Sequence, residues 1–289
     1  MKKYIKFYVL FVLTLSLTSL SCFQEQKNSS GYEDIAYSRI KENKPIRIAY
    51  ISYPPSFIVD PNTKKFSGIF FDVINEIAKR TGFKIEFVEE TSWASMIEEL
   101  QSNKVDIVVS GIWPNSQRGK WVSFTKPLYY SGINAYVRAG DTRFDNNIEA
   151  ANSPDVKIAV IDGEMSSIIA NSDFPKAKKI HYNQMTDVSQ LLLEVATGKA
   201  DITFVETAVA KRFMAKNPGK IREVKLNRPL RIFPNCMMVR KTDIYFLDTL
   251  NISIEELHNN GYIDKVIKKY EKFPGSFYRV RLPFEKEYK

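Results

Sequence analysis

The chain has 289 residues, of which 44% are hydrophobic and 26% charged, the balance of a packed globular protein. Its formal charge is +9, but Lys2, Lys3 and Lys6 contribute three of these charges, so the segment from Cys22 onward carries 39 basic and 33 acidic side chains. This small excess forms no basic run, which argues against nucleic-acid binding. The length is sufficient for one large or two modest domains.

Residues 1–21 are typical of a secretory signal peptide. Three lysines precede an apolar run from Phe7 to Leu20, and small residues follow it. The run has 14 residues, fewer than the roughly 20 that a membrane-spanning helix needs. We therefore expect residues 1–21 to be removed and the mature protein to work outside the cytoplasm, in the periplasm or at the cell surface.

Cys22 follows this run, and Ser19-Leu20-Ser21-Cys22 resembles the lipobox of bacterial lipoproteins. The resemblance implies a lipid on the Cys22 thiol that anchors the mature protein to a bacterial membrane. The match is incomplete, because the best-matching boxes have leucine three residues before the cysteine and glycine or alanine just before it. A plain secretory signal with an incidental cysteine therefore stays open. Residues 22–44 are polar and weakly periodic, which indicates a flexible tether.

Cys236 is the second of the two cysteines in the chain. If Cys22 is lipidated, no intrachain disulfide is possible. Because Cys236 lies within the apolar segment Asn235-Cys236-Met237-Met238-Val239, we expect it to pack as a small hydrophobic side chain.

The folded body is expected to begin at residue 45 with a first α/β unit. Ile46-Arg47-Ile48-Ala49-Tyr50 alternates like a strand, and Tyr53-Pro54-Pro55 forces a turn. Asp72 is the expected N-cap of a helix that ends at Thr81-Gly82. The expected elements are a strand at 46–50, a helix at 72–81, a strand at 84–88, a helix around 96–100 and a strand at 105–109. This order argues for a parallel sheet wrapped in helices.

A second unit repeats this pattern. Its expected elements are strands at 157–161, 178–182 and 200–205, and helices around 166–170 and 188–196. A similar tripeptide leads into the last strand of each unit, Lys104-Val105-Asp106 in the first and Lys199-Ala200-Asp201 in the second. Two similar α/β units predict two lobes with a cleft between them. Ligands of such folds bind beyond the carboxyl ends of the strands.

The region from Ile46 to about Tyr270 resembles the extracellular solute-binding proteins of amino-acid ABC importers, family 3. The match covers most of the chain that follows the signal peptide. The matching stretches are Tyr53-Pro54-Pro55, Gly68-Ile69-Phe70-Phe71-Asp72-Val73, Ser92-Trp93, Leu100-Gln101-Ser102-Asn103-Lys104-Val105-Asp106, Ser110-Gly111-Ile112 through Arg118, Phe124-Thr125-Lys126-Pro127-Leu128-Tyr129 and Met238-Val239-Arg240-Lys241.

This resemblance implies an α/β fold of the two-lobed type II periplasmic-binding-protein class, each lobe a mostly parallel sheet flanked by helices. Residues 45–136 and 236–289 would form the first lobe, and residues 137–235 would form the second. Hinge segments are expected near 137–140 and 232–235. The implied function is capture of an amino acid or similar small zwitterion between closing lobes, for delivery to an ABC permease. We expect a monomer without a cofactor or a nucleic-acid partner.

A site for an amino acid needs a cation, an anion and an apolar or aromatic wall. Arg118 stands seven residues after Gly111, where the resemblance implies the carboxylate-binding arginine. A guanidinium fork takes a carboxylate through two parallel hydrogen bonds, which a lysine ammonium does not. Glu206 stands where relatives have an acid, usually Asp, for the ligand ammonium. The alternatives are a surface arginine for Arg118 and a helix N-cap or surface carboxylate for Glu206.

Tyr53 and Trp93 match positions where the family is implied to hold the ligand side chain between aromatic rings. Such stacking or cation–π contact contributes about 0.5–2 kcal/mol beyond area burial. Core packing is the alternative for both side chains. Backbone groups of Ser110 and Gly111, at the end of a predicted strand, are further candidates for ligand binding.

Three positions depart from the family. Trp113 stands where amino-acid binders usually have Ser or Thr, and its ring is expected at the pocket mouth. Glu164-Met165 replaces two threonines, so we expect backbone N–H groups at a helix N-terminus, at Met165 and Ser166, to bind the carboxylate. Tyr50 stands where binders of basic amino acids have Asp. The absence of this Asp argues against a pocket specific for lysine or arginine, and the sequence leaves the identity of the ligand side chain undetermined.

Exported cyclohexadienyl and arogenate dehydratases share many of these motifs, so an enzyme is the rival function. They resemble one another in a further carboxylate one helical turn after the Glu206 position, where this chain has Val209. Dehydration needs a positioned acid to protonate the leaving hydroxyl. With only two histidines and no common catalytic or phosphate-binding motif, we expect no catalytic residue and no metal. A ligand-sensing module is the third possibility.

Overall fold

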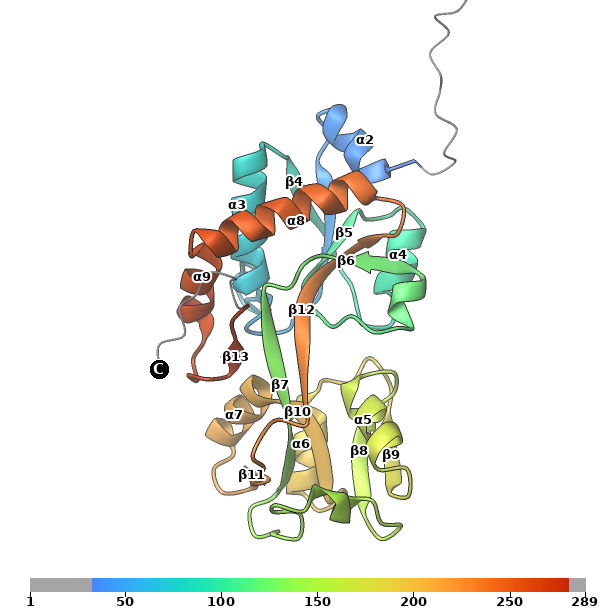
Figure 1. Ribbon diagram of the computed structural model, residues 1–289, viewed down its shortest axis with the longest axis vertical. Helices are drawn as coiled ribbons and strands as arrows, with labels where there is room; N and C mark the ends of the chain where they lie inside the picture. The colour runs from blue at the N-terminus through green and yellow to red at the C-terminus, as the bar shows by residue number, and fades with distance from the viewer. Residues whose placement is uncertain (1–32, 281–289) are drawn as a thin grey trace, which may run out of the picture. The chain divides into compact units, whose positions relative to one another are not determined.

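The computed structural model describes residues 33–280, so Cys22 and the expected signal peptide lie outside the described residues. The fold is built on a mixed sheet whose main strands follow the order β4-β1-β5-β12-β7-β10-β8-β9 (Figure 1). Neighbouring strands are parallel at both ends of this order and antiparallel in the middle. Their bounds are β1 Ile46–Tyr50, β4 Ile85–Glu90, β5 Ile107–Ile112, β7 Tyr129–Arg138, β8 Lys157–Ile161, β9 Lys178–Tyr182, β10 Ile202–Glu206 and β12 Arg231–Arg240.

The parallel strands β4, β1 and β5 have helices on both faces, as the sequence predicted. Alternate residues of a strand point to opposite faces, so Ile107 and Val109 join the core under helices α3 and α8, whereas Val108 packs with α4. The helices packed around these three strands are α3 Ile69–Thr81, α4 Met96–Gln101, α8 Ile244–Asn259 and α9 Tyr262–Tyr270.

The prediction that Asp72 caps α3 is wrong. The helix begins three residues earlier, at Ile69, because Gly68 takes the N-cap position with φ of +117°. A side chain at Gly68 would collide with the backbone of Ser56 and Phe57. Asp72 instead lies in the first helical turn, and its carboxylate pairs with Lys269 of α9 at 2.8 Å. The predicted end at Gly82 is confirmed, with φ of +75°.

The parallel strands β10, β8 and β9 are covered in the same way. Helix α5 (Met165–Asp173) packs on one face with Ile158 and Val160 of β8. Helices α6 (Ser189–Ala196) and α7 (Thr207–Lys216) pack on the other face with Ala159 and Ile161. The predicted order of strands and helices is therefore confirmed here, with no predicted end shifted by more than three residues.

Two long strands, β7 and β12, connect the two parallel groups in antiparallel pairing (Figure 1). β12 pairs with β7 through residues 231–235 and with β5 from Cys236 onward. β7 pairs with β12 through residues 129–133 and with β10 from Ile133 to Val137. The remaining elements are β2 Ile58–Val59, β3 Phe66–Ser67, η1 Arg118–Lys120, β6 Val122–Phe124, η2 Ile148–Ala151, β11 Ile221–Glu223 and β13 Phe277–Tyr278.

Part of the predicted tether is folded, which corrects its expected bounds of 22–44. Residues Ile35–Lys41 form helix α2, capped by Asp34, whose carboxylate accepts the Tyr37 amide at 2.7 Å. The other oxygen of Asp34 accepts the amides of Tyr245 and Phe246 at the start of α8. These bonds join α2 to the body. No helix within residues 33–280 combines the length and the apolarity that crossing a membrane requires.

The repeated Lys-(Val/Ala)-Asp tripeptide has the same structural role in both units. Asp106 accepts the Arg47 amide at 2.9 Å, and Asp201 accepts the Lys157 amide at 2.9 Å. The backbone amides of the two aspartates donate in return: that of Asp106 to the Arg47 carbonyl and that of Asp201 to the Lys157 carbonyl, both at 2.8 Å. The tripeptide therefore fixes the start of the first strand of each unit.

Replacing Asp106 with asparagine should lower the free energy of unfolding by about 3–5 kcal/mol, because it removes a buried carboxylate that pairs with Arg47 and with Arg240 and leaves the buried Arg240 with Asp243 alone. The Asp106 carboxylate is fully buried, and the guanidinium of Arg240, with a side chain 6% exposed, donates to it at 2.8 Å. Asp201→Asn is the matched control. Its free energy of unfolding should fall by less, because its partner Arg143 is half exposed. Urea unfolding of the two variants measures this difference, and equal losses would contradict the assigned cost of burial.

Cys236 is 2% exposed and aligns with Ile112 of the neighbouring strand. Burial raises the pKa of its thiol to about 12. The prediction that Cys236 packs as a small hydrophobic side chain is confirmed.

Candidate functional site

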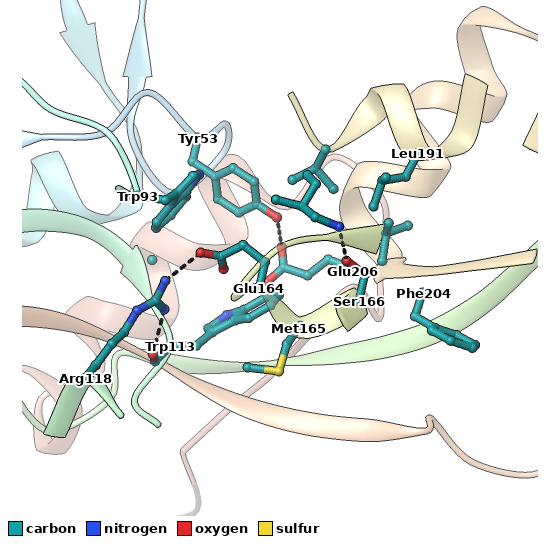
Figure 2. A pocket seen from close by; sticks show the side chains of 14 residues that line it. Tyr53, Trp93, Trp113, Arg118, Glu164, Met165, Ser166, Leu191, Phe204 and Glu206 are labelled. Atoms are coloured by element: carbon teal, nitrogen blue, oxygen red, sulfur yellow. Dashed lines mark hydrogen bonds and ion pairs between the residues drawn. The ribbon is translucent and has the colours of Figure 1, made fainter. Parts of the chain in front are cut away.

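A cavity lies at the carboxyl ends of β5, β8 and β10, where the sequence placed the site. Figure 2 shows side chains from separate segments pointing into it. Among its lining residues the charged ones are Arg118, Glu164 and Glu206. The full lining consists of Tyr53, Trp93, Gly111, Trp113, Arg118, Ile161, Glu164, Met165, Ser166, Val188, Leu191, Phe204, Val205 and Glu206.

Arg118 is positioned by its own short helix, η1, and is 8% exposed. Its amide donates to the Asn115 side chain at 2.9 Å, and one terminal nitrogen donates to the Trp113 carbonyl at 3.1 Å. The other terminal nitrogen pairs with Glu164 Oε1 at 2.6 Å (Figure 2). The guanidinium is thus fixed in place, and one side of its fork already holds a carboxylate.

Glu164 precedes α5, as its N-cap residue, and its side chain is 14% exposed. Glu164 departs from the family pattern and is not among the ligand-binding residues predicted from the sequence. The signal available was an acid directly before a helix whose N-terminus was expected to face the ligand. Burial raises the pKa of Glu164, and the Arg118 charge offsets part of that effect.

Glu206 is the last residue of β10 and the N-cap residue of α7, and it is 3% exposed. Its Oε2 accepts the Tyr53 hydroxyl at 3.0 Å, whereas its Oε1 is buried and has no hydrogen-bond partner among residues 33–280. Burial raises the pKa of Glu206, and the hydroxyls of Ser131 and Tyr53 offset part of this. A buried carboxylate oxygen without a donor can accept a hydrogen bond from a ligand.

Three aromatic residues form a wall beside these charges. The rings of Tyr53 and Trp93 meet edge to face, with centroids 5.6 Å apart. Trp113 stacks on Phe233 at 5.4 Å, and its indole nitrogen donates to Asn235 at 3.1 Å. The Trp113 ring therefore lies at the cavity, and Phe233 and Asn235 of β12 hold it there.

Met165 and Ser166 line the cavity at the N-terminus of α5. The Ser166 hydroxyl accepts the Ile161 amide at 2.9 Å, which ties this helix end to β8. Gly111 also lines the cavity, and a side chain there would collide with Ser56 and Asn235. Ser110, predicted to offer backbone groups, does not line it, because the whole residue is buried within β5, and its hydroxyl donates to the Ile51 carbonyl at 3.1 Å.

Eight of the nine predicted ligand-binding residues thus line one cavity, and Ser110 does not. Most of the lining residues that the sequence did not single out are apolar. They belong to strands and helices whose pattern indicated only core packing: Ile161, Val188, Leu191, Phe204 and Val205. Within residues 33–280, no three histidine, cysteine, aspartate or glutamate side chains come together as metal ligands.

The family model of the bacterial extracellular solute-binding proteins, family 3, matches residues 46–273. A probable histidine-binding protein of Campylobacter jejuni is 29% identical over 211 residues, covering 72% of this chain and 77% of the relative. The arginine-binding extracellular protein ArtP of Bacillus subtilis is 24% identical over 275 residues, covering 93% and 98%. Membrane-bound lytic murein transglycosylase F of Vibrio cholerae is 23% identical, but only 50% of its length is covered.

Solved structures agree with this match. The ancestral amino-acid-binding protein AncCDT-1, described as a precursor of cyclohexadienyl dehydratase, has a TM-score of 0.69 and 29% identity, covering 81% of this chain and 98% of that one. An ancestral arginine-binding protein bound to arginine has a TM-score of 0.65 and 26% identity, covering 78% and 97%. The predicted likeness to periplasmic-binding-protein structures is confirmed at the level of the α/β fold.

Proposed function

Since the chain belongs to the bacterial extracellular solute-binding proteins, family 3, we propose that it captures an amino acid and delivers it to an ABC permease. The observation that carries this proposal is one cavity with a buried arginine, a buried glutamate and an aromatic wall. An amino acid presents one group for each of these features. The ligands named for its relatives, histidine and arginine, belong to the same class.

The geometry supports a role for each residue. Arg118 has five N–H donors and so retains donors for a ligand carboxylate beside its bonds to Trp113 and Glu164. The unpaired oxygen of Glu206 offers a position for the ligand ammonium. Tyr53 and Trp93 would contact the ligand side chain, and the N-terminus of α5 would add backbone donors at Met165 and Ser166.

A thermal-shift screen of the mature protein against amino acids, amines and small carboxylates tests the proposal. A ligand that binds only the folded state raises the unfolding midpoint by mass action. We expect at least one amino acid to raise the midpoint and no small carboxylate without an amine to do so. A screen in which no amino acid raises the midpoint would contradict the function.

We further propose that the body consists of two lobes that close on the ligand. Arg118 and Glu206 belong to the two different parallel groups, so one ligand would join both, and closure requires such differential contact.

The chain would cross between the two lobes on β7 and β12. Buried side chains of β7 change from one core to the other between Tyr129 and Ile133, so we place the first hinge there and not at residues 137–140. Solution scattering should show a smaller radius of gyration with saturating ligand, and an unchanged radius would contradict closure.

The location rests on residues before the described part. We propose that residues 1–21 are a signal peptide and that Cys22 carries a lipid, so that a tether shortened by α2 holds the protein at the membrane. Labelling of cells with a clickable fatty acid should mark the wild type but not Cys22→Ala. Release of unmodified wild-type protein into the medium would contradict the anchor.

The dehydratase remains the second candidate, because the AncCDT-1 structure is described as a precursor of such an enzyme. Val209, at the position of the dehydratase carboxylate, is buried in α7 and offers no proton. Prephenate turnover by the purified protein would support the enzyme, and its absence together with amino-acid binding would support the solute-binding function. Genes for a permease and an ATPase beside this one would favour the importer over a sensor.

A further inference from the structure

We infer that Glu164 is a specificity-determining residue, which together with Glu206 makes the cavity select ligands with one net positive charge. The inference rests on the proposed function, because it concerns the same cavity. It extends that function from an amino acid of any kind to one defined by its charge.

The cavity holds more negative than positive charge. Its charged lining residues are one cation, Arg118, and two anions, Glu164 and Glu206. All three are largely withdrawn from water, with side chains of Arg118 and Glu164 that are 9% and 14% exposed and a Glu206 that is 3% exposed. The charge of Arg212 lowers the pKa of Glu206 to some extent, but Arg212 donates to the Pro54 carbonyl at 2.7 Å and does not line the cavity. The lining residues therefore lack one positive charge, which a ligand can supply.

A neutral amino acid cannot supply that charge. Its carboxylate would approach Arg118, whose guanidinium would then face the ligand carboxylate and Glu164 at once. Its ammonium would pair with Glu206 and leave two carboxylates for one guanidinium. An unpaired charge out of water is strongly unfavourable, so Glu164 penalises such a ligand.

Two kinds of monocation avoid this penalty. A basic amino acid has its carboxylate for Arg118, its α-ammonium for Glu206 and a second cation for Glu164. A monoamine without a carboxylate leaves the Arg118–Glu164 pair intact and places its ammonium at Glu206. Glu164 would thus replace the acid that the Tyr50 position lacks: Tyr50 packs in the core against Phe57, with ring centroids 4.9 Å apart, and does not line the cavity.

Titration calorimetry with charge-matched ligands tests this inference. L-arginine and L-citrulline have nearly the same shape and differ by one charge, as do L-lysine and L-norleucine, and n-pentylamine is the probe without a carboxylate. For wild type, we expect the cationic member of at least one pair to bind about tenfold or more tighter than either neutral amino acid. Binding of n-pentylamine but of no amino acid would contradict the proposed function, and this inference with it.

Variants of Glu164 show whether this residue causes the preference. In Glu164→Gln the ratio between the members of a pair should fall to within about threefold, whereas Glu164→Asp, which keeps the charge, should retain the preference. Asp162→Asn is the matched control. It removes a nearby carboxylate that is exposed and pairs with His181 at 2.6 Å, and it should leave the ratio unchanged. Thermal unfolding confirms that each variant is folded.

Three results would overturn the inference. A neutral amino acid could bind wild type as tightly as its cationic partner or more tightly. Glu164→Gln could strengthen binding of both members of a pair by the same factor, which would show that Glu164 competes with every ligand for Arg118 and does not select by charge. If no amino acid binds wild type or Glu164→Gln, the proposed function itself fails, and this inference fails with it.

Discussion

Replacing Arg118 with alanine should weaken amino-acid binding by roughly 30-fold to several thousand-fold, because truncating one partner of a buried charge pair costs about 2–5 kcal/mol. Arg118 is 8% exposed and is the one cation among the described residues that line the cavity. Arg118→Lys should also bind poorly, since an ammonium does not reproduce the guanidinium fork. Titration calorimetry with the best amino acid from the screen measures both losses.

The pair between Arg118 and Glu164 requires a further control. Arg118→Ala leaves the Glu164 carboxylate buried without its 2.6 Å partner, so part of the loss could come from that stranded charge. The double variant Arg118→Ala/Glu164→Gln removes the stranded charge and should still bind the amino acid poorly if Arg118 contacts the ligand carboxylate. Recovery to within threefold of wild type would show that the carboxylate binds elsewhere.

Replacing Glu206 with glutamine should weaken amino-acid binding by a similar factor, because the ligand ammonium loses its counter-ion. A ligand without an ammonium should be affected much less. Burial raises the pKa of Glu206, so it takes up a proton at a higher pH than an ordinary glutamate does. Wild-type affinity should therefore fall as the pH is lowered, beginning above the usual carboxyl range, because protonated Glu206 no longer attracts the ammonium.

The pH dependence of affinity separates this role from a structural one. Glu223→Gln is a matched control, because burial also raises the pKa of Glu223 although it does not line the cavity. In Glu206→Gln, affinity should fall much less as the pH is lowered. The fall that is left should come from Glu164, whose pKa is also raised. Glu223→Gln should keep the wild-type profile. The same profile in all three proteins would exclude Glu206 as the ammonium site.

The sequence predicted the elements of the fold better than their ends. Alternating and helical periodicity located the strands of both parallel groups, because burial of one face follows directly from local pattern. The start of α3 was missed because it depends on Gly68, whose conformation is required by the backbone of Ser56 and Phe57. Helix α2 was missed because it is held by distant contacts, from Asp34 to the first residues of α8 near the other end of the chain.

The candidate site shows the same division. Arg118, Glu206 and the aromatic residues were found because their spacing matched a family pattern, which carries three-dimensional information that local periodicity lacks. Glu164 was not selected, because its importance depends on a partner, Arg118, that is 46 residues away in the sequence. Ser110 was selected for its place at a strand end, but its side chain points toward Ile51.

A crystal structure of the protein with the amino acid that gives the largest thermal shift tests the central claim most directly. We predict the ligand in the cavity of Figure 2, with its carboxylate within hydrogen-bond distance of Arg118 and its ammonium within the same distance of Glu206 Oε1. The rings of Tyr53 and Trp93 should contact its side chain. A ligand bound in another cavity, or bound here with its ammonium away from Glu206 and its carboxylate away from Arg118, would contradict the account.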